Sequence, residues 1–299
     1  MKRFLCSLSL LLAFQPPLSG SAEAQQISVI DDGGNLLVLE QPAQRIVSLA
    51  PSMTELLFSI GAGSRIVGVM AFSDYPPAAT TIPVVGQFDL LDMEGILALQ
   101  PDLIVAWKTG NPRSSIARLQ ALGIPVYIAE PTTLASIATE LEKLARLTGL
   151  EDQGQSIAAD FLAALDGLAQ ANADKPAVSV FYQVWDSPLI SVGGPELIND
   201  IIRRCGGRNI FADLPVGPKV SVEAVLSHNP DVIIASGMDA NRPPWLDDWQ
   251  VWSQLNAVKN DNLFFIPPDL VQRHSLRALQ GTRQMCAHLD QARSNITAF

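Results

Sequence analysis

The sequence predicts an α/β protein of two lobes, each built on a central, mostly parallel sheet, with a single long backbone helix joining them. Short apolar runs of strand length alternate with segments of helical spacing in both halves of the chain. Between the halves, residues 151–172 carry apolar side chains at helical intervals and no proline. We therefore expect an N-terminal lobe over residues 25–150, a connecting helix over 151–172 and a C-terminal lobe over 173–299.

The start of the chain, residues 1–24, has the pattern of a secretory signal peptide. Lys2 and Arg3 precede an apolar run over 4–14, and small residues lead to Ala24, after which we expect cleavage. The apolar run is shorter than the roughly 18 residues that a transmembrane helix needs. The sequence therefore predicts an exported protein.

Removal of this segment changes the cysteine count from three to two. Cys6 leaves with the signal peptide, and Cys205 and Cys286 remain in a compartment that permits disulfides. We expect these two residues to be bonded. The alternative is a pair of buried thiols.

The composition limits the partners of the protein. The formal net charge is −10, and it becomes −11 without the predicted signal peptide. Such an acidic chain disfavours nucleic acid and anionic membrane surfaces as partners. A hydrophobic content of 48% over 299 residues is ample for a core, and this length favours two lobes over one.

The first lobe opens with a predicted hairpin, because residues 27–30 and 36–39 flank a turn that contains two glycines. A strand over 46–49, a turn at Pro51 and Ser52, and a helix to residue 60 follow. We expect Ser52 or Thr54 to cap this helix and Glu55 to serve its first turn. Further strands are predicted at 66–69, 103–106 and 126–128, and helices around 94–99 and 112–122.

The second lobe repeats the alternation. Strands are predicted at 178–182, 232–235 and 263–266, and helices at 196–204, at 222–227 and from about Ser275. Residues 93–107 align without gaps against 222–236, with Glu, Leu, Pro, Asp, Ile and Ala at the same offsets. We interpret this as an internal repeat, the alternative being chance similarity at a common Pro-Asp turn. Two similar lobes place a ligand crevice between their strand ends.

The chain lacks the motifs of common enzyme and metal sites. It has no Gly-x-Ser-x-Gly elbow, no His-Glu-x-x-His and no Cys-x-x-Cys spacing, and only three histidines. We assign no catalytic residues, no metal site and no cofactor. An exported two-lobed α/β protein without such motifs is most simply a binding protein.

Four motifs in order carry a specific resemblance. They are Arg45-Ile-Val-Ser-Leu-Ala-Pro-Ser-Met-Thr-Glu-Leu56, Phe72-Ser-Asp-Tyr-Pro-Pro77, Glu94 with Leu99-Gln-Pro-Asp-Leu-Ile-Val-Ala-Trp107, and Cys205-Gly-Gly-Arg-Asn-Ile-Phe211. With them the chain resembles the periplasmic binding proteins of ABC importers that have a helical backbone, especially the vitamin B12 (cobalamin) binders. The resemblance implies two Rossmann-like lobes, a periplasmic monomer that closes little, and delivery of ligand to a membrane permease with its ATPase.

The resemblance also implies a set of ligand contacts, to which we add Trp185 because other rim aromatics of these binders are absent. Aromatic rings suit the apolar faces of a corrin, and Asp and Arg suit its peripheral amides. The expected contacts are Pro51, Ser52, Phe72, Phe88, Trp107, Gly110, Trp185, Ile190, Asp269 and Arg273.

Three of these assignments have structural alternatives. Trp107 could be core packing, and Asp269 with Arg273 could be a salt bridge at a helix start. His274 could approach a bound metal or be a solvated histidine. Glu94 and Glu223, at equivalent places in the repeat, are implied to dock onto permease arginines, the alternative being two solvated residues in first helical turns.

The sequence therefore leaves three candidate functions. The first is capture of cobalamin or a related corrinoid for an ABC importer. The second keeps the class and takes a ferric siderophore or haem as ligand, because the aromatic rim is thin. The third is an exported corrinoid-modifying enzyme on the same fold.

Overall fold

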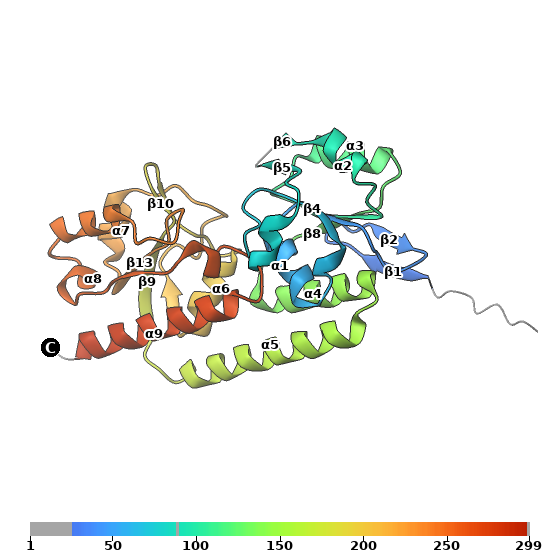
Figure 1. Cartoon of the computed structure of the whole chain (residues 1–299). Coiled ribbons are helices and arrows are strands. Elements are labelled where there is room, and N and C mark those ends of the chain that lie inside the picture. Colours follow the sequence, from blue (N-terminus) through green and yellow to red (C-terminus); the bar gives the residue numbers. More distant parts are fainter. Residues whose placement is uncertain (1–25, 88–89, 298–299) are drawn as a thin grey trace, which may run out of the picture.

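The computed structural model describes residues 26–87 and 90–297 as two α/β lobes above a pair of long helices (Figure 1). The predicted signal peptide and Phe88 lie outside these described residues. Among the described residues, no helix combines the length and the apolar character needed to cross a bilayer.

The first lobe contains a four-stranded parallel sheet in the order β4-β3-β7-β8. Its strands read as β-branched and apolar runs, and they are buried on both faces, as parallel strands between helices must be. The elements are β3 (Ile46–Ser48), α1 (Pro51–Ser59), β4 (Ile66–Val69), α2 (Met93–Ala98), β7 (Leu103–Trp107), α3 (Arg113–Ala121), β8 (Val126–Ala129) and α4 (Leu134–Thr148).

The second lobe has a parallel sheet of the same topology, in the order β12-β9-β13-β14. In both sheets the strands run second, first, third, fourth along the chain, and the predicted repeat pairs α2 and β7 with α7 and β13. The elements are β9 (Val178–Gln183), α6 (Leu197–Arg204), β12 (Gly207–Asn209), α7 (Val222–His228), β13 (Val232–Ala235), α8 (Asn256–Lys259), β14 (Leu263–Phe265) and α9 (Ala278–Thr297).

Each lobe also contains short antiparallel hairpins outside its main sheet. The predicted N-terminal hairpin is confirmed, with Ile27 opposite Leu39 and Ile30 opposite Leu36. Two other hairpins were not predicted, because their strands of two residues are too short to show periodicity. The hairpin elements are β1 (Ile27–Ile30), β2 (Leu36–Leu39), β5 (Gly86–Gln87), β6 (Leu90–Leu91), β10 (Trp185–Asp186) and β11 (Leu189–Ile190).

Helix α5 (Glu151–Asn172) has the bounds that the sequence predicts and runs beneath both lobes beside α4 and α9 (Figure 1). Gly149, at φ 67°, ends α4 in the left-handed conformation that glycine adopts at little cost. Helices flank this glycine on both sides, and of the two only α5 was predicted. Phe161 and Leu165 of α5 belong to one buried apolar cluster that extends into both lobes.

The predicted disulfide is present. Cys205 caps the end of α6 and is bonded to Cys286 of α9, with the two Cα atoms 4.7 Å apart. The bond closes a sequence separation of 81 residues and fixes the C-terminal helix against the second lobe.

Helix α1 begins at Pro51, earlier than predicted, with Ala50 as its N-cap residue. Proline is favoured at the first helical position because its fixed φ suits the helix and it has no N–H to leave unpaired. The expectation that Ser52 or Thr54 caps this helix was wrong, because both residues lie inside it. The Thr54 hydroxyl instead donates to Ser48 Oγ and approaches the carbonyl of Ala50.

Candidate functional site

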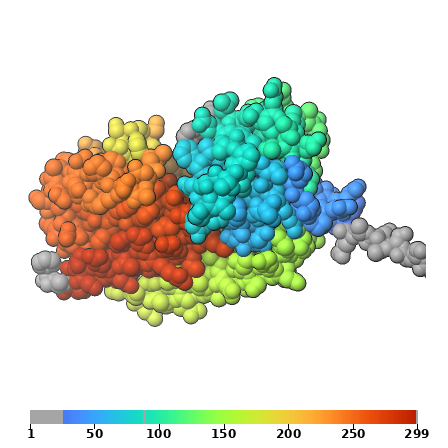
Figure 2. Space-filling model, in the orientation of Figure 1, coloured from blue at the N-terminus to red at the C-terminus, as the bar shows by residue number. Residues whose placement is uncertain are grey.

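The candidate site lies between the lobes, at the carboxyl edges of both sheets. Pro51 follows β3 and Trp107 ends the neighbouring strand β7 of the first sheet, and Val184 and Met238 follow neighbouring strands of the second. This is the place where open α/β sheets bind ligands, because the chain departs there in opposite directions. In the space-filling view the lobes meet along a notch that opens at the upper edge (Figure 2).

Two adjoining cavities occupy this region, of about 230 and 350 Å³. Trp107, Gln272 and His274 belong to the linings of both. Six of the predicted contacts come together in the smaller cavity, although they are spread over most of the chain. They are Pro51, Ser52, Phe72, Trp107, Asp269 and Arg273.

Trp107 is held in place by the turn that follows β7. Its backbone N–H donates to Asn111 Oδ1 at 2.6 Å, and Asn111 Nδ2 donates to the carbonyl of Leu49 at 2.9 Å. Gly110 lies against the indole, and a Cβ on this residue would overlap the ring. The absence of a side chain at Gly110 thus leaves room for the indole of Trp107. Within the described part of the chain, Gly110 does not line either cavity.

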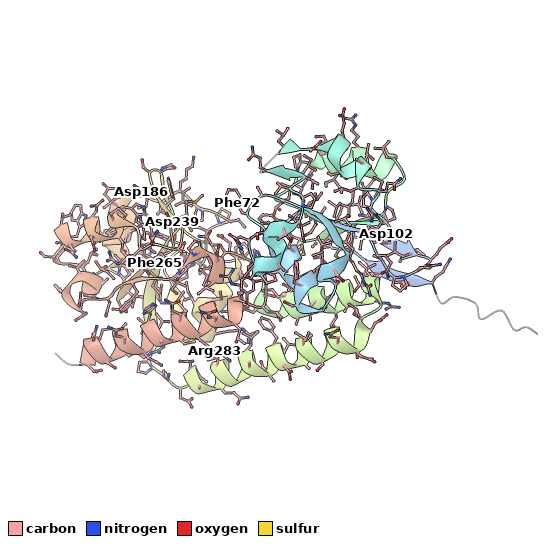
Figure 3. All side chains as sticks on the ribbon, in the orientation of Figure 1. Phe72, Asp102, Asp186, Asp239, Phe265 and Arg283 are labelled. Atoms are coloured by element: carbon pink, nitrogen blue, oxygen red, sulfur yellow. A yellow bond between two sulfur atoms is a disulfide. The ribbon has the colours of Figure 1, made fainter. Side chains whose placement is uncertain are left out.

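Phe72 is placed at the mouth of the smaller cavity by a strained backbone. Its φ of 67° lies in the left-handed region, which a bulky residue rarely adopts and which costs about 1 kcal/mol or more. The side chain is 61% exposed and lies at the edge of the first lobe that faces the second (Figure 3). A strained, exposed aromatic ring at a cavity mouth is suited to contact a ligand.

The larger cavity is mostly apolar. Its second-lobe wall comes from Val184, the turn after β11 and the start of α6, with Glu196 as a polar member, and Glu130 lies on the first-lobe side after β8. Among residues that the structure describes, Trp185 and Ile190 do not line either cavity. They face one another across the hairpin β10–β11 next to Val184, and the Trp185 indole N–H donates to the carbonyl of Ser187 at 3.1 Å.

Arg273 is held by carboxylates from both lobes. Its Nη1 lies 2.9 Å from Glu55 Oε1 and 2.6 Å from Asp74 Oδ1, and its Nη2 lies 3.1 Å from Asp269 Oδ1. Partial burial opposes ionisation of Asp74, but its hydrogen bond and ion pair with Arg273 lower its pKa below the ordinary value. The Asp269 ion pair was one of the expected alternatives, but it forms on the turn before α9, because that helix begins only at Ala278.

Glu55 joins the lobes, so the expectation that it serves only the first turn of α1 was wrong. Its side chain is 3% exposed, and its carboxylate accepts a 2.5 Å hydrogen bond from Ser275 Oγ and lies 3.3 Å from Arg277 Nη1. Arg277 in turn lies over the ring of Tyr75, 4.5 Å from its centroid. The signal in the sequence was an acid among the apolar residues of a buried helix, since a buried charge needs a partner.

Gln272 and His274 complete the shared wall of the two cavities. Gln272 Nε2 donates to Ser236 Oγ at 2.6 Å, which leaves its carbonyl oxygen as an acceptor for a ligand. His274 is half-buried and faces Trp107, with the ring centroids 6.4 Å apart. Loss of hydration lowers the pKa of His274 to about 4, so the imidazole is uncharged at neutral pH.

A metal site built by the chain alone is not found in the part that the structure describes. Across residues 26–87 and 90–297, no group of three or more His, Cys, Asp and Glu side chains is arranged to hold a metal ion. The cleft offers aromatic and apolar surface, a few hydrogen-bonding groups and one uncharged imidazole, which suits a large, partly apolar molecule.

Known proteins are similar to this chain in sequence and fold. The profile of a family described as periplasmic binding protein matches residues 46–270. The Vitamin B12-binding protein of Vibrio cholerae serotype O1 is 37% identical over 257 residues, covering 85% of this chain and 92% of the relative. That of Yersinia pestis is 35% identical over 260 residues, covering 83% and 87%. The crystal structure of the periplasmic Vitamin B12 binding protein BtuF of Vibrio cholerae superposes with a TM-score of 0.77 at 36% identity, covering 84% of this chain and 98% of that one.

Proposed function

Because this chain belongs to the periplasmic binding protein family, we propose that it captures a corrinoid such as vitamin B12 between its lobes and delivers it to an ABC importer. Its relatives are substrate-binding proteins and not enzymes, which removes the alternative of an exported corrinoid-modifying enzyme.

One observation supports the ligand most directly. Phe72 and Trp107 from one lobe face the cleft together with Pro51, while Met238 and Gln272 line it from the other lobe. A corrin ring has broad apolar faces for the aromatic rings and peripheral amides for polar groups such as the free oxygen of Gln272. Of the polar contacts expected, Arg273 is already engaged by three carboxylates, so we expect Asp269 and Gln272 to provide more of the hydrogen bonding.

Delivery requires a surface that the permease recognises. Glu94 and Glu223 are exposed in the first turns of α2 and α7, one in each lobe. These helices lie on the upper side of the molecule, opposite α5 and α9 (Figure 1). A backbone N–H and the Ser221 hydroxyl lower the pKa of Glu223 and keep it charged. We infer that the two carboxylates dock onto cationic groups of the permease.

The proposal includes export and a monomeric state. The family is periplasmic, and we expect the signal peptide to be removed after Ala24. A single chain supplies both walls of the cleft, so ligand capture needs no second copy.

Calorimetric titration of the purified protein with cyanocobalamin tests the proposed ligand. We expect saturable binding of one ligand per chain at micromolar concentration or below, and a change in the visible spectrum of the ligand. Absence of heat and of a spectral change would refute the corrinoid assignment. Parallel titrations with haemin and a ferric siderophore would then show whether the second candidate ligand class applies.

A further inference from the structure

The three histidines differ in how their ring nitrogens are used. His228 Nδ1 lies 2.8 Å from the carbonyl oxygen of Ala224, and His288 Nε2 lies 3.3 Å from that of Phe265. His274 makes no hydrogen bond to any of the described residues, and its ring lies near that of Trp107. Neither ring nitrogen is both buried and unpaired, so the imidazole stays accessible to solvent or to a ligand in the cleft.

The position of His274 indicates what could use it. The residue lies between the turn Pro268–Leu270 and α9, and it belongs to the linings of both cavities. Trp107 faces it from the first lobe, so a flat ligand that fills both cavities passes next to the imidazole. Loss of hydration favours the uncharged ring, in which one nitrogen carries an available lone pair.

We propose that His274 binds the cobalt of a corrinoid directly, as an axial ligand, when that cobalt carries an exchangeable water. This inference rests on the function proposed above and defines which corrinoids the cleft prefers. The cobalt–oxygen bond to water breaks and the water leaves with its electron pair. A cobalt–nitrogen bond forms from the imidazole lone pair, the other ring nitrogen keeps its proton, and the oxidation state of cobalt is unchanged. Imidazole is a suitable ligand for such a metal ion.

Selectivity follows from this chemistry. A corrinoid with an axial water gains a coordinate bond in the cleft, whereas cyanocobalamin, with cyanide and its own base on cobalt, has no position to offer. His274 therefore favours the first kind of ligand over the second, in addition to the apolar contacts that both kinds share.

Visible absorption spectroscopy of the protein with aquocobinamide tests the proposal, with cyanocobalamin as the comparison ligand. We expect the wild-type protein to shift the absorption bands of bound aquocobinamide, and His274→Ala to bind it with the spectrum of the free ligand. Both ligands lose the packing contact of the ring in this variant, but the affinity for aquocobinamide should fall about tenfold or more beyond the loss seen for cyanocobalamin. His228→Ala is the matched control and should behave as wild type.

A second measurement needs no variant. Cyanide added to the wild-type complex should replace the imidazole and abolish the spectral shift. Equal spectra for wild type and His274→Ala, or equal losses of affinity for both ligands, would overturn the inference while leaving the proposed function in place. Failure of the wild-type protein to bind either corrinoid would overturn both.

Discussion

Glu55 of the first lobe and Arg273 of the second form an ion pair of 2.9 Å, with 3% and 15% of their side chains exposed. The two residues are 218 positions apart in the chain, and the contact lies beside the smaller cavity. Ser275 and Arg277 contact the same carboxylate. One buried acid of the first lobe therefore holds three residues of the second lobe that lie between β14 and α9.

Replacing Glu55 with Gln should destabilise the fold. Gln keeps the shape of the side chain but leaves Arg273 and Arg277 without their buried counter-charge, which should lower the free energy of unfolding by about 2–4 kcal/mol. Urea unfolding followed by circular dichroism measures this. Glu142→Gln, at an exposed position of α4, is the control and should change stability by less than about 0.5 kcal/mol. Equal effects of the two substitutions would contradict a joining role for Glu55.

Gly110→Ala should weaken ligand binding without unfolding the protein. A Cβ at this position overlaps the indole of Trp107, so the ring must leave its place in the cleft. We expect the Kd for cyanocobalamin to rise about tenfold, measured by calorimetry. Gly167→Ala in α5 is the matched control, because a Cβ there meets open space. It should leave the Kd unchanged, and an unchanged Kd in Gly110→Ala would show that the ring position does not matter.

Glu140 should make the stability of the first lobe depend on pH. Its side chain is buried, and burial together with the nearby charge of Asp32 raises its pKa from about 4.5 to about 8. The folded state therefore holds a proton that the unfolded state releases above about pH 4.5. The stability that the folded state gains by holding this proton is present in full below about pH 4.5 and is lost as the pH rises to about 8.

Thermal unfolding at a series of pH values checks this prediction. Glu140→Gln, which stays neutral, should flatten the decline between pH 5 and 8 and be the more stable protein at pH 8, by roughly 2 kcal/mol or more. Parallel curves for the variant and the wild type across this range would exclude Glu140 as the source.

Glu94→Arg and Glu223→Arg should each impair import while leaving ligand affinity unchanged. Charge reversal places a cation against the cationic groups expected on the permease, which slows encounter and weakens docking. Uptake of labelled cyanocobalamin by cells that carry the cognate importer should fall about tenfold or more, and the Kd should stay within about twofold. Glu151→Arg on α5 makes the same change of charge on the opposite side of the molecule and should transport normally (Figure 1). Equal uptake by all three variants would rule out docking through Glu94 and Glu223.

Periodicity and turn residues were sufficient to predict much of this fold. The alternation of strands and helices gave both parallel sheets, and helical spacing without proline gave α5 with its observed bounds. Trp107 and Pro51 could be placed at a crevice because each follows a buried strand, and parallel strands end at one edge of a sheet. These inferences depend only on local pattern.

Contacts between distant segments could not be predicted in this way. Nothing near Glu55 in the sequence indicates Arg273. Even over the three residues from Trp107 to Gly110, the sequence does not show that the glycine lies under the indole and is not a ligand contact. Gln272 and Met238 were missed because each lies in a turn without a regular pattern, and only the approach of the two lobes brings them to the cleft. Trp185 was assigned to the cleft because other rim aromatics are absent, and it does not line either of the two cavities described above.

The contacts that hold the lobes together are all made by the chain's own residues, from the Glu55 carboxylate to the apolar cluster that passes through α5. Ligand binding therefore does not have to create them, and the spacing of Glu94 and Glu223 is set by the fold itself. An importer that recognises the distance between Glu94 and Glu223 would bind molecules with and without ligand equally well. Unloaded copies would then compete for the permease, and uptake would pass through a maximum as the abundance of the binding protein rises.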